Sequence, residues 1–236
     1  MHTQTHDMST FRVAPDTFLT HNADMSEHHA DISRQKPGTP TARERLRSAE
    51  LGAFFRPSQM VEAGLTRSQL RALVRVGDVE RIGRGLYRLA EAEATENYSI
   101  AMATARVPIS VICLLTALRV HGIGTQAPAE VWLAIPHRAR NPRLPELRLR
   151  VVRFSGPAWH HGVNPITFEG VPARMTGPAR TITDCFRYER LIGPETAMEA
   201  LQDGLSQRKV TIAELARVEE VLPSRRLRAA LDTRSI

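Results

Sequence analysis

Three arginines spaced four residues apart carry the clearest chemistry in the sequence. Arg67, Arg71 and Arg75 share one face of a helix, because four residues make about one helical turn. Ser68 and Ala72 widen that face with small side chains, which permit close approach to a groove. Guanidinium groups donate hydrogen bonds to phosphate oxygens and guanine edges. The pattern predicts a DNA-contacting helix. The alternative is a solvated basic face, but no acidic residue stands four positions away to balance these charges.

The surrounding residues predict the elements that hold this helix. Thr66, with Gln69 three residues later, is a capping box that starts the helix, and Gly77-Asp78 ends it. Two helices are expected before it, one from Thr41 to about Phe55 and a short one opened by Pro57-Ser58. Two short strands, 79–82 and 85–89, follow around a turn at 83–85. This order predicts a winged helix-turn-helix.

The hairpin adds further basic residues to the predicted DNA contact. Arg84 lies at its tip, where a wing would meet the DNA backbone or minor groove. Between residues 43 and 89 there are ten arginines and five acidic residues. The full set of predicted DNA contacts is Thr66, Arg67, Ser68, Gln69, Arg71, Arg75, Arg81, Arg84 and Arg88.

A second basic run covers residues 137–153, which hold six arginines and a single acid, Glu146. Arginines alternate with apolar residues over 147–151, as in a strand with one basic and one buried face. Three interpretations stay open: a solvated face, a second contact with DNA or RNA, and a docking surface for an acidic partner. The candidate residues are Arg138, Arg140, Arg143, Arg148 and Arg150.

Composition limits the class of protein. The chain has 236 residues, 24% of them charged, and a formal net charge of +7. Thirty of its 32 basic residues are arginines, a bias that also arises from genome composition. No apolar run is long enough to span a bilayer, and the first residues lack the pattern of a signal peptide. Two cysteines exclude a disulfide scaffold or a cysteine-based zinc site. We expect a cytoplasmic protein without metal or cofactor.

The remaining chain predicts a tail and a second domain. Residues 1–40 lack periodicity, which predicts a disordered tail. Residues 41–90 are predicted to form the winged helix. Residues 91–236 are predicted to form a larger α+β domain with helices packed on a small sheet. The expected helices are 95–106, 110–120, 178–191, 195–206, 212–222 and 224–231, and the expected strands are 131–135, 147–154, 166–168 and 171–175.

The residues that could support catalysis do not form a recognisable site in the sequence, so we expect that this protein is not an enzyme. The chain lacks a Gly-rich phosphate loop, a His-Glu-x-x-His motif and an Asp-x-Asp pair on a strand. Cys113 lies in an apolar segment typical of a core, and Cys185 has no evident base beside it. The segment 178–188 is expected to be a central packing helix, with Arg180 and Asp184 spaced for an ion pair and Ile182, Cys185 and Phe186 on its core face. The alternative is a partner-binding surface.

Three segments together resemble the AbiEi-type antitoxins of abortive-infection (type IV) toxin–antitoxin systems. They are GLTRSQLRALVRVGDVERIGRGLYRL at 64–89, VWLAIPHRAR at 131–140 and PARTITDCFRYERLIG at 178–193. The resemblance covers about residues 41–225 in the family's order. Thr183 departs from it, since an apolar residue is expected there.

The resemblance implies a function. The winged helix would bind inverted repeats in its own promoter and repress the operon. The C-terminal domain would help repression and counter a nucleotidyltransferase-like toxin encoded alongside. Nothing catalytic carries over. The alternative is an ordinary winged-helix transcription factor whose C-terminal domain senses a ligand or dimerises. Monomers on paired half-sites and dimers both remain compatible with the sequence.

Overall fold

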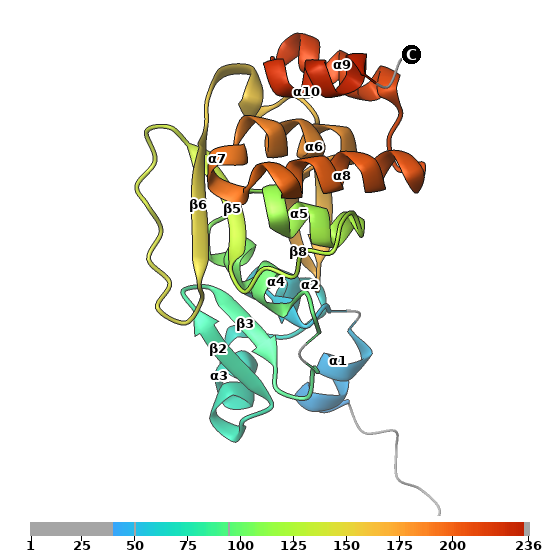
Figure 1. The fold of residues 1–236 in the computed structure, drawn as a ribbon. Helices are drawn as coiled ribbons and strands as arrows, with labels where there is room; N and C mark the ends of the chain where they lie inside the picture. The colour runs from blue at the N-terminus through green and yellow to red at the C-terminus, as the bar shows by residue number, and fades with distance from the viewer. Residues whose placement is uncertain (1–39, 50, 94, 234–236) are drawn as a thin grey trace, which may run out of the picture. The chain divides into compact units, whose positions relative to one another are not determined.

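The computed structural model describes residues 40–49, 51–93 and 95–233. The predicted tail therefore lies outside the described residues, apart from Pro40. From Pro40 onward the chain forms one compact unit. It is a mixed α+β structure, as predicted (Figure 1).

Residues 41–90 form three helices and a three-stranded antiparallel sheet of order β1-β3-β2. The elements are α1 (Ala42–Ser48), β1 (Phe54–Phe55), α2 (Pro57–Glu62), α3 (Arg67–Val76), β2 (Val79–Gly83) and β3 (Leu86–Leu89). The second and third helices and the hairpin lie where the sequence predicts them. We call this part the N-terminal segment.

The first predicted helix is wrong in its second half. Instead of reaching Phe55, it ends at Ser48, and Phe54–Phe55 form a strand that pairs with β3. Burial explains the difference, because successive residues of a strand point to opposite faces. Phe55 packs in the core of the N-terminal segment, whereas Phe54 packs in a cluster with Ile100 and Leu133 of the following part. The strand therefore places one ring in each of the two cores.

The rest of the chain is built around a five-stranded mixed sheet of order β6-β5-β4-β8-β7. Its strands are β4 (Val111–Ile112), β5 (Val131–Pro136), β6 (Leu149–Phe154), β7 (Val163–Phe168) and β8 (Val171–Thr176). Its helices are α4 (Tyr98–Arg106), α5 (Leu114–His121), the 3-10 turn η1 (Gly156–Trp159), α6 (Pro178–Arg187), α7 (Glu189–Ile192), α8 (Pro194–Ser206), α9 (Ile212–Val221) and α10 (Arg225–Asp232).

Two helix predictions need correction here. The expected helix 110–120 begins instead with a strand, because β-branched Val111 and Ile112 complete the centre of the sheet between β5 and β8. The expected helix 178–191 is divided at Tyr188 into α6 and α7. The other predicted elements form, with shifted ends.

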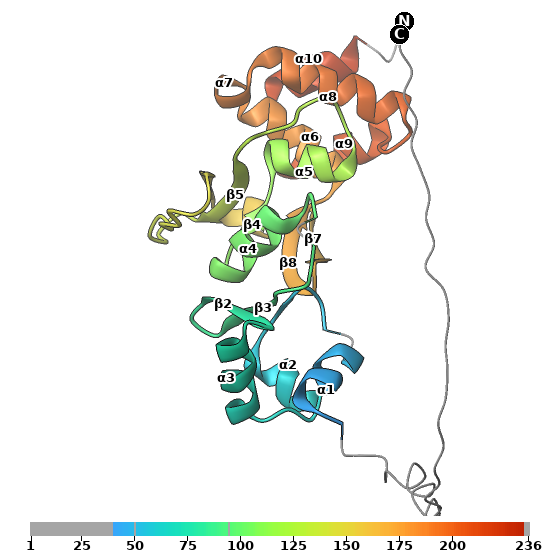
Figure 2. The ribbon, with the colours of Figure 1, turned by 90° about the horizontal axis from the view of Figure 1, so that it is seen from below.

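The five-stranded sheet is a middle layer with a core on each face (Figure 2). Trp132 and Ala134 of β5 pack against α5, α6 and α8, whereas Val131, Leu133 and Ile135 pack against α4 and against Phe54 and Leu86 of the N-terminal segment. Burial on both faces explains why β5 is a continuous apolar run. The N-terminal segment thus shares a core with the sheet.

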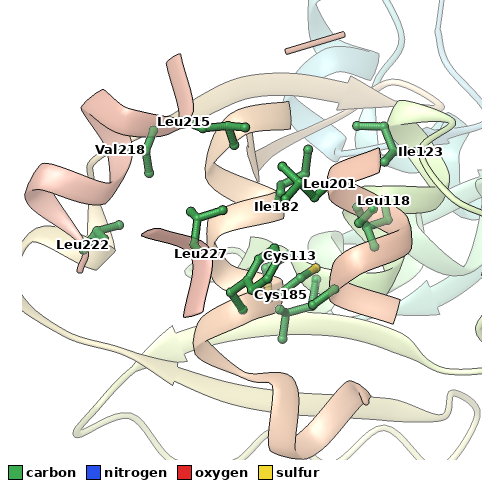
Figure 3. Packing of buried hydrophobic residues seen from close by; sticks show 14 of the residues in the cluster. Cys113, Leu118, Ile123, Ile182, Cys185, Leu201, Leu215, Val218, Leu222 and Leu227 are labelled. Atoms are coloured by element: carbon green, nitrogen blue, oxygen red, sulfur yellow. The ribbon is translucent and has the colours of Figure 1, made fainter. Parts of the chain in front are cut away.

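Helix α6 lies at the centre of the first of these cores. Ile182 and Cys185 pack with Cys113 and Leu201, and the C-terminal helices add Leu215 and further apolar residues (Figure 3). This confirms the prediction of a central packing helix, and it confirms that Cys113 is a core residue. Thr183 is accommodated in the core because its hydroxyl donates to the carbonyl of Ala179, 2.9 Å away.

Candidate nucleic-acid interface

Helix α3 begins with the predicted capping box. The Thr66 N–H donates to Gln69 Oε1 at 2.8 Å, and the Gln69 N–H donates to Thr66 Oγ1 at 3.2 Å. These bonds satisfy backbone groups that a helix start would leave free. Gly77 ends the helix with a φ of 82°, in the left-handed region that glycine adopts without strain. The cap occupies the Gln69 carbonyl oxygen, so only the amide nitrogen of this side chain is available to a ligand.

The two faces of α3 differ as the spacing of its residues predicts. Leu70 and Leu73 are buried against α1 and α2 in the core of the N-terminal segment. The opposite face is exposed, and its residues are Arg67, Ser68, Arg71, Ala72 and Arg75. Within the described part of the chain, none of these three arginines forms an ion pair. The face therefore carries uncompensated positive charge.

The hairpin presents two of its three predicted arginines. Arg81 and Arg84 are exposed on β2 and on the turn. Arg88 is buried at 8% exposure, donates to the carbonyl of Ala92, and lies 5.3 Å from the ring centroid of Tyr98. The alternation of side chains along a strand could have predicted that Arg88 is buried, because Arg88 lies on the same face of β3 as buried Leu86. We therefore leave Arg88 out of the proposed contact.

The second basic run forms the β5–β6 connection and the start of β6. We call residues 137–150 the basic loop. Its arginines are all exposed: Arg138, Arg140, Arg143, Arg148 and Arg150. Arg153 serves a different purpose, because its guanidinium donates to Pro136 O at 3.0 Å, His137 O at 3.1 Å, Asn141 Oδ1 at 2.6 Å and the Ala139 carbonyl. Arg153 thus holds the loop while its neighbours face solvent.

The structure joins the hairpin and the basic loop through a residue that sequence reasoning missed. Arg106, at the end of α4, donates from Nη1 to Ile82 O at 3.1 Å and to Glu146 Oε1 at 2.8 Å. Glu146 is the single acid among residues 137–153, and this bond engages it. No local pattern marks Arg106, because its partners lie 24 and 40 residues away in sequence.

Comparison with known proteins identifies the N-terminal segment. Residues 45–90 match the model of a family described as "Transcriptional regulator, AbiEi antitoxin". The predicted family resemblance is confirmed for this segment. The matched residues run from within α1 to just after the hairpin, and they include both the arginine face of α3 and the hairpin arginines.

One solved structure is similar over most of the chain. It is the crystal structure of the RV2827C protein from Mycobacterium tuberculosis, with a TM-score of 0.50 and 18% identity, covering 77% of this chain and 72% of that one. At this identity the likeness concerns the fold alone. A search of curated proteins found no match. None of the described helices is long and apolar enough to cross a membrane.

Proposed function

We propose that this chain is a DNA-binding antitoxin that represses its own operon. In this proposal the N-terminal segment is a winged helix-turn-helix, α3 enters the major groove, and the β2–β3 hairpin is the wing. The observation that carries the proposal is the arginine face of α3, exposed and without acidic partners. The AbiEi match over residues 45–90 supports it, because that family is described as a transcriptional regulator and antitoxin.

Each group on this face has a defined role in the proposal. Arg67, Arg71 and Arg75 would donate to phosphates or guanine edges, while Ser68 and Ala72 allow the helix backbone to approach the bases. Thr66 and Gln69 hydrogen-bond to each other in the capping box, and they would hold the N-terminus of α3 in position to meet a phosphate. Arg81 and Arg84 of the wing would contact the neighbouring backbone.

The experiment that tests this proposal is a mobility-shift titration on the DNA upstream of the chain's own gene. A scrambled fragment of the same length serves as control, and both are titrated at two salt concentrations. Selective binding that persists at the higher salt supports a sequence-specific repressor. Equal binding to both fragments that disappears with salt contradicts it, because phosphate contacts alone carry no sequence information.

We further propose that the C-terminal part counters a nucleotidyltransferase-like toxin encoded beside it, as the family resemblance implies. Co-expression tests this: the full chain should restore growth of cells that express the neighbouring nucleotidyltransferase. Arrested growth despite equal expression contradicts the antitoxin role. Promoter binding without rescue would favour an ordinary winged-helix transcription factor.

The basic loop is proposed as a second contact with the same DNA. The loop and the wing share the guanidinium of Arg106, so both lie beside the end of α4. A duplex that meets the exposed wing arginines therefore passes close to the exposed arginines of the loop. The other interpretation, an acidic protein partner, predicts that loop variants leave DNA affinity unchanged.

A further inference from the structure

An irregularity in the β2–β3 ladder is the starting point. Arg81 is opposite Tyr87 and Gly83 is opposite Leu86, so Ile82 has no opposing residue in β3. Such a bulge bends the strand and removes a residue from the ladder. It occurs directly before the Gly83-Arg84-Gly85 turn, which carries the exposed Arg84.

The carbonyl group at this bulge is bound from outside the N-terminal segment. Arg106 Nη1 donates to Ile82 O, and the same nitrogen is 2.8 Å from the carboxylate of Glu146. The Arg106 side chain is 30% exposed and the Glu146 side chain 39% exposed. The guanidinium therefore connects the bent strand of the hairpin with the base of the basic loop.

Gly83 leaves the space that this contact needs. A Cβ atom built on Gly83 would be 3.2 Å from Cδ and Nη1 of Arg106 and 3.3 Å from its Nε. This is closer than ordinary van der Waals contact, so a side chain at position 83 would require the arginine to shift by a few tenths of an ångström. The bulge, the glycine and the arginine thus form one arrangement.

We infer that Arg106 is a positioning residue for DNA binding: from outside the winged helix, it fixes the direction of the wing relative to the basic loop. The inference rests on the proposed function. Arg106 acts through the backbone of Ile82 rather than by touching DNA. Without it the hairpin tip would move freely, and Arg84 would lose its contact with a phosphate.

A double-mutant cycle on DNA tests this inference. Arg84→Ala and Arg106→Ala should each weaken operator binding roughly three- to tenfold and lower the slope of log K against log salt by about 0.9, the value for one phosphate. The double variant should be no weaker than either single variant, because both remove the same contact. Additive losses would mean that Arg106 has its own contact, and unchanged binding in Arg106→Ala would mean that the wing needs no such support. Either result overturns the inference.

Two variants serve as comparison. Arg119→Ala removes an arginine of α5 with similar exposure, 25%, that forms an ion pair with Glu96 shortly before α4, and it should leave DNA binding unchanged. Gly83→Ala crowds the guanidinium by only a few tenths of an ångström, so it should weaken DNA binding less than Arg106→Ala does. Thermal melting of all variants separates a general loss of stability from the specific effect, since instability alone does not change the salt slope.

A measurement without DNA tests whether Arg106 holds the hairpin, separately from the test of the proposed function. Amide hydrogen exchange should become at least severalfold faster at residues 82–87 in Arg106→Ala and remain unchanged in α3. Unchanged exchange in the hairpin would overturn the positioning role even if the wild-type chain represses its promoter. If wild-type protein fails to select its upstream DNA, the proposed function fails, and the exchange result still decides whether Arg106 holds the hairpin.

Discussion

Arg180 and Asp184 form a buried ion pair on α6, with Nε 2.9 Å from Oδ2 and side-chain exposures of 1% and 0%. The arginine also donates to the carbonyl of Ala158 at 2.9 Å and to that of His161. Arg187 binds the other carboxylate oxygen at 3.0 Å. The pair therefore ties α6 to the η1 turn, and each charge is satisfied within the core rather than by water.

Breaking this pair should be strongly destabilising. Asp184→Ala leaves the buried Arg180 without its partner carboxylate, and loss of one member of a buried pair costs about 3–5 kcal/mol of unfolding free energy. Urea unfolding measures the change. Asp232→Ala, at an exposed aspartate of α10, is the control and should change stability by less than about 0.5 kcal/mol. A loss at Asp184 as small as the control's would show that the pair is dispensable.

Replacing the arginine face of α3 should abolish promoter binding without unfolding the chain. In Arg67→Ala/Arg71→Ala/Arg75→Ala, each lost phosphate contact should lower the salt slope by about 0.9, while stability stays within about 0.5 kcal/mol for each exposed site. The control triple variant Arg190→Ala/Arg217→Ala/Arg225→Ala removes the same charge from exposed positions on the C-terminal helices. If both variants weaken binding equally, net charge rather than α3 determines affinity.

The basic loop should contribute to affinity but little to sequence selectivity. Arg138→Ala/Arg140→Ala/Arg143→Ala should weaken binding to operator and scrambled DNA by the same factor, because phosphate contacts do not distinguish sequences. Fluorescence anisotropy with both duplexes measures this factor. Unchanged affinity for both duplexes would contradict a DNA contact and would favour a protein partner for the basic loop.

Acid should destabilise the fold through His121. Burial lowers the pKa of this imidazole, and nearby Lys209 lowers it further, although Nε2 is 2.7 Å from the carbonyl oxygen of Thr176. The unfolded chain then binds the proton more readily, so this contribution to stability is present above about pH 6.5 and is lost as the pH falls below it. Urea unfolding at about pH 7.5 and 5.5 measures the loss. His121→Gln should lose less stability over the same interval, and an equal loss would assign the effect to other groups.

The contact between the N-terminal segment and the β7–β8 turn should tolerate no side chain. Gly170 has a φ of +84°, and a Cβ there would lie 2.7 Å from Gly52 Cα. Gly64→Ala is a matched control, since its φ is +74° but nothing lies within 4 Å of the added atom. Both variants should lose about 1–2 kcal/mol from the left-handed backbone. Gly170→Ala should lose clearly more in unfolding experiments, and equal losses would show that the two backbones can separate at no cost.

Local sequence determines much of the candidate interface. The Thr66–Gln69 capping box, the Gly77 stop and the spacing of Arg67, Arg71 and Arg75 all act within a few residues, so they could be predicted without knowing what packs nearby. The hairpin follows from its glycine turn and short apolar runs. The resemblance to the AbiEi family rests in part on the same residues, and the match over 45–90 confirms it there.

Contacts between distant residues decided the rest. Phe54 and Phe55 form a strand because two cores, built from separate parts of the chain, each take one ring. From the sequence alone Arg180 and Arg88 would be expected on the surface, but both are buried by the elements that pack against them. The bond from Arg106 to the hairpin carbonyl depends on where α4 ends relative to a bulge 24 residues earlier. The groups that could contact DNA were predictable from the residue types and from helix and turn signals, because these signals are local. Which of these groups are exposed, and which contacts hold them, depends on burial and long-range hydrogen bonds, and these arise only when distant segments pack together.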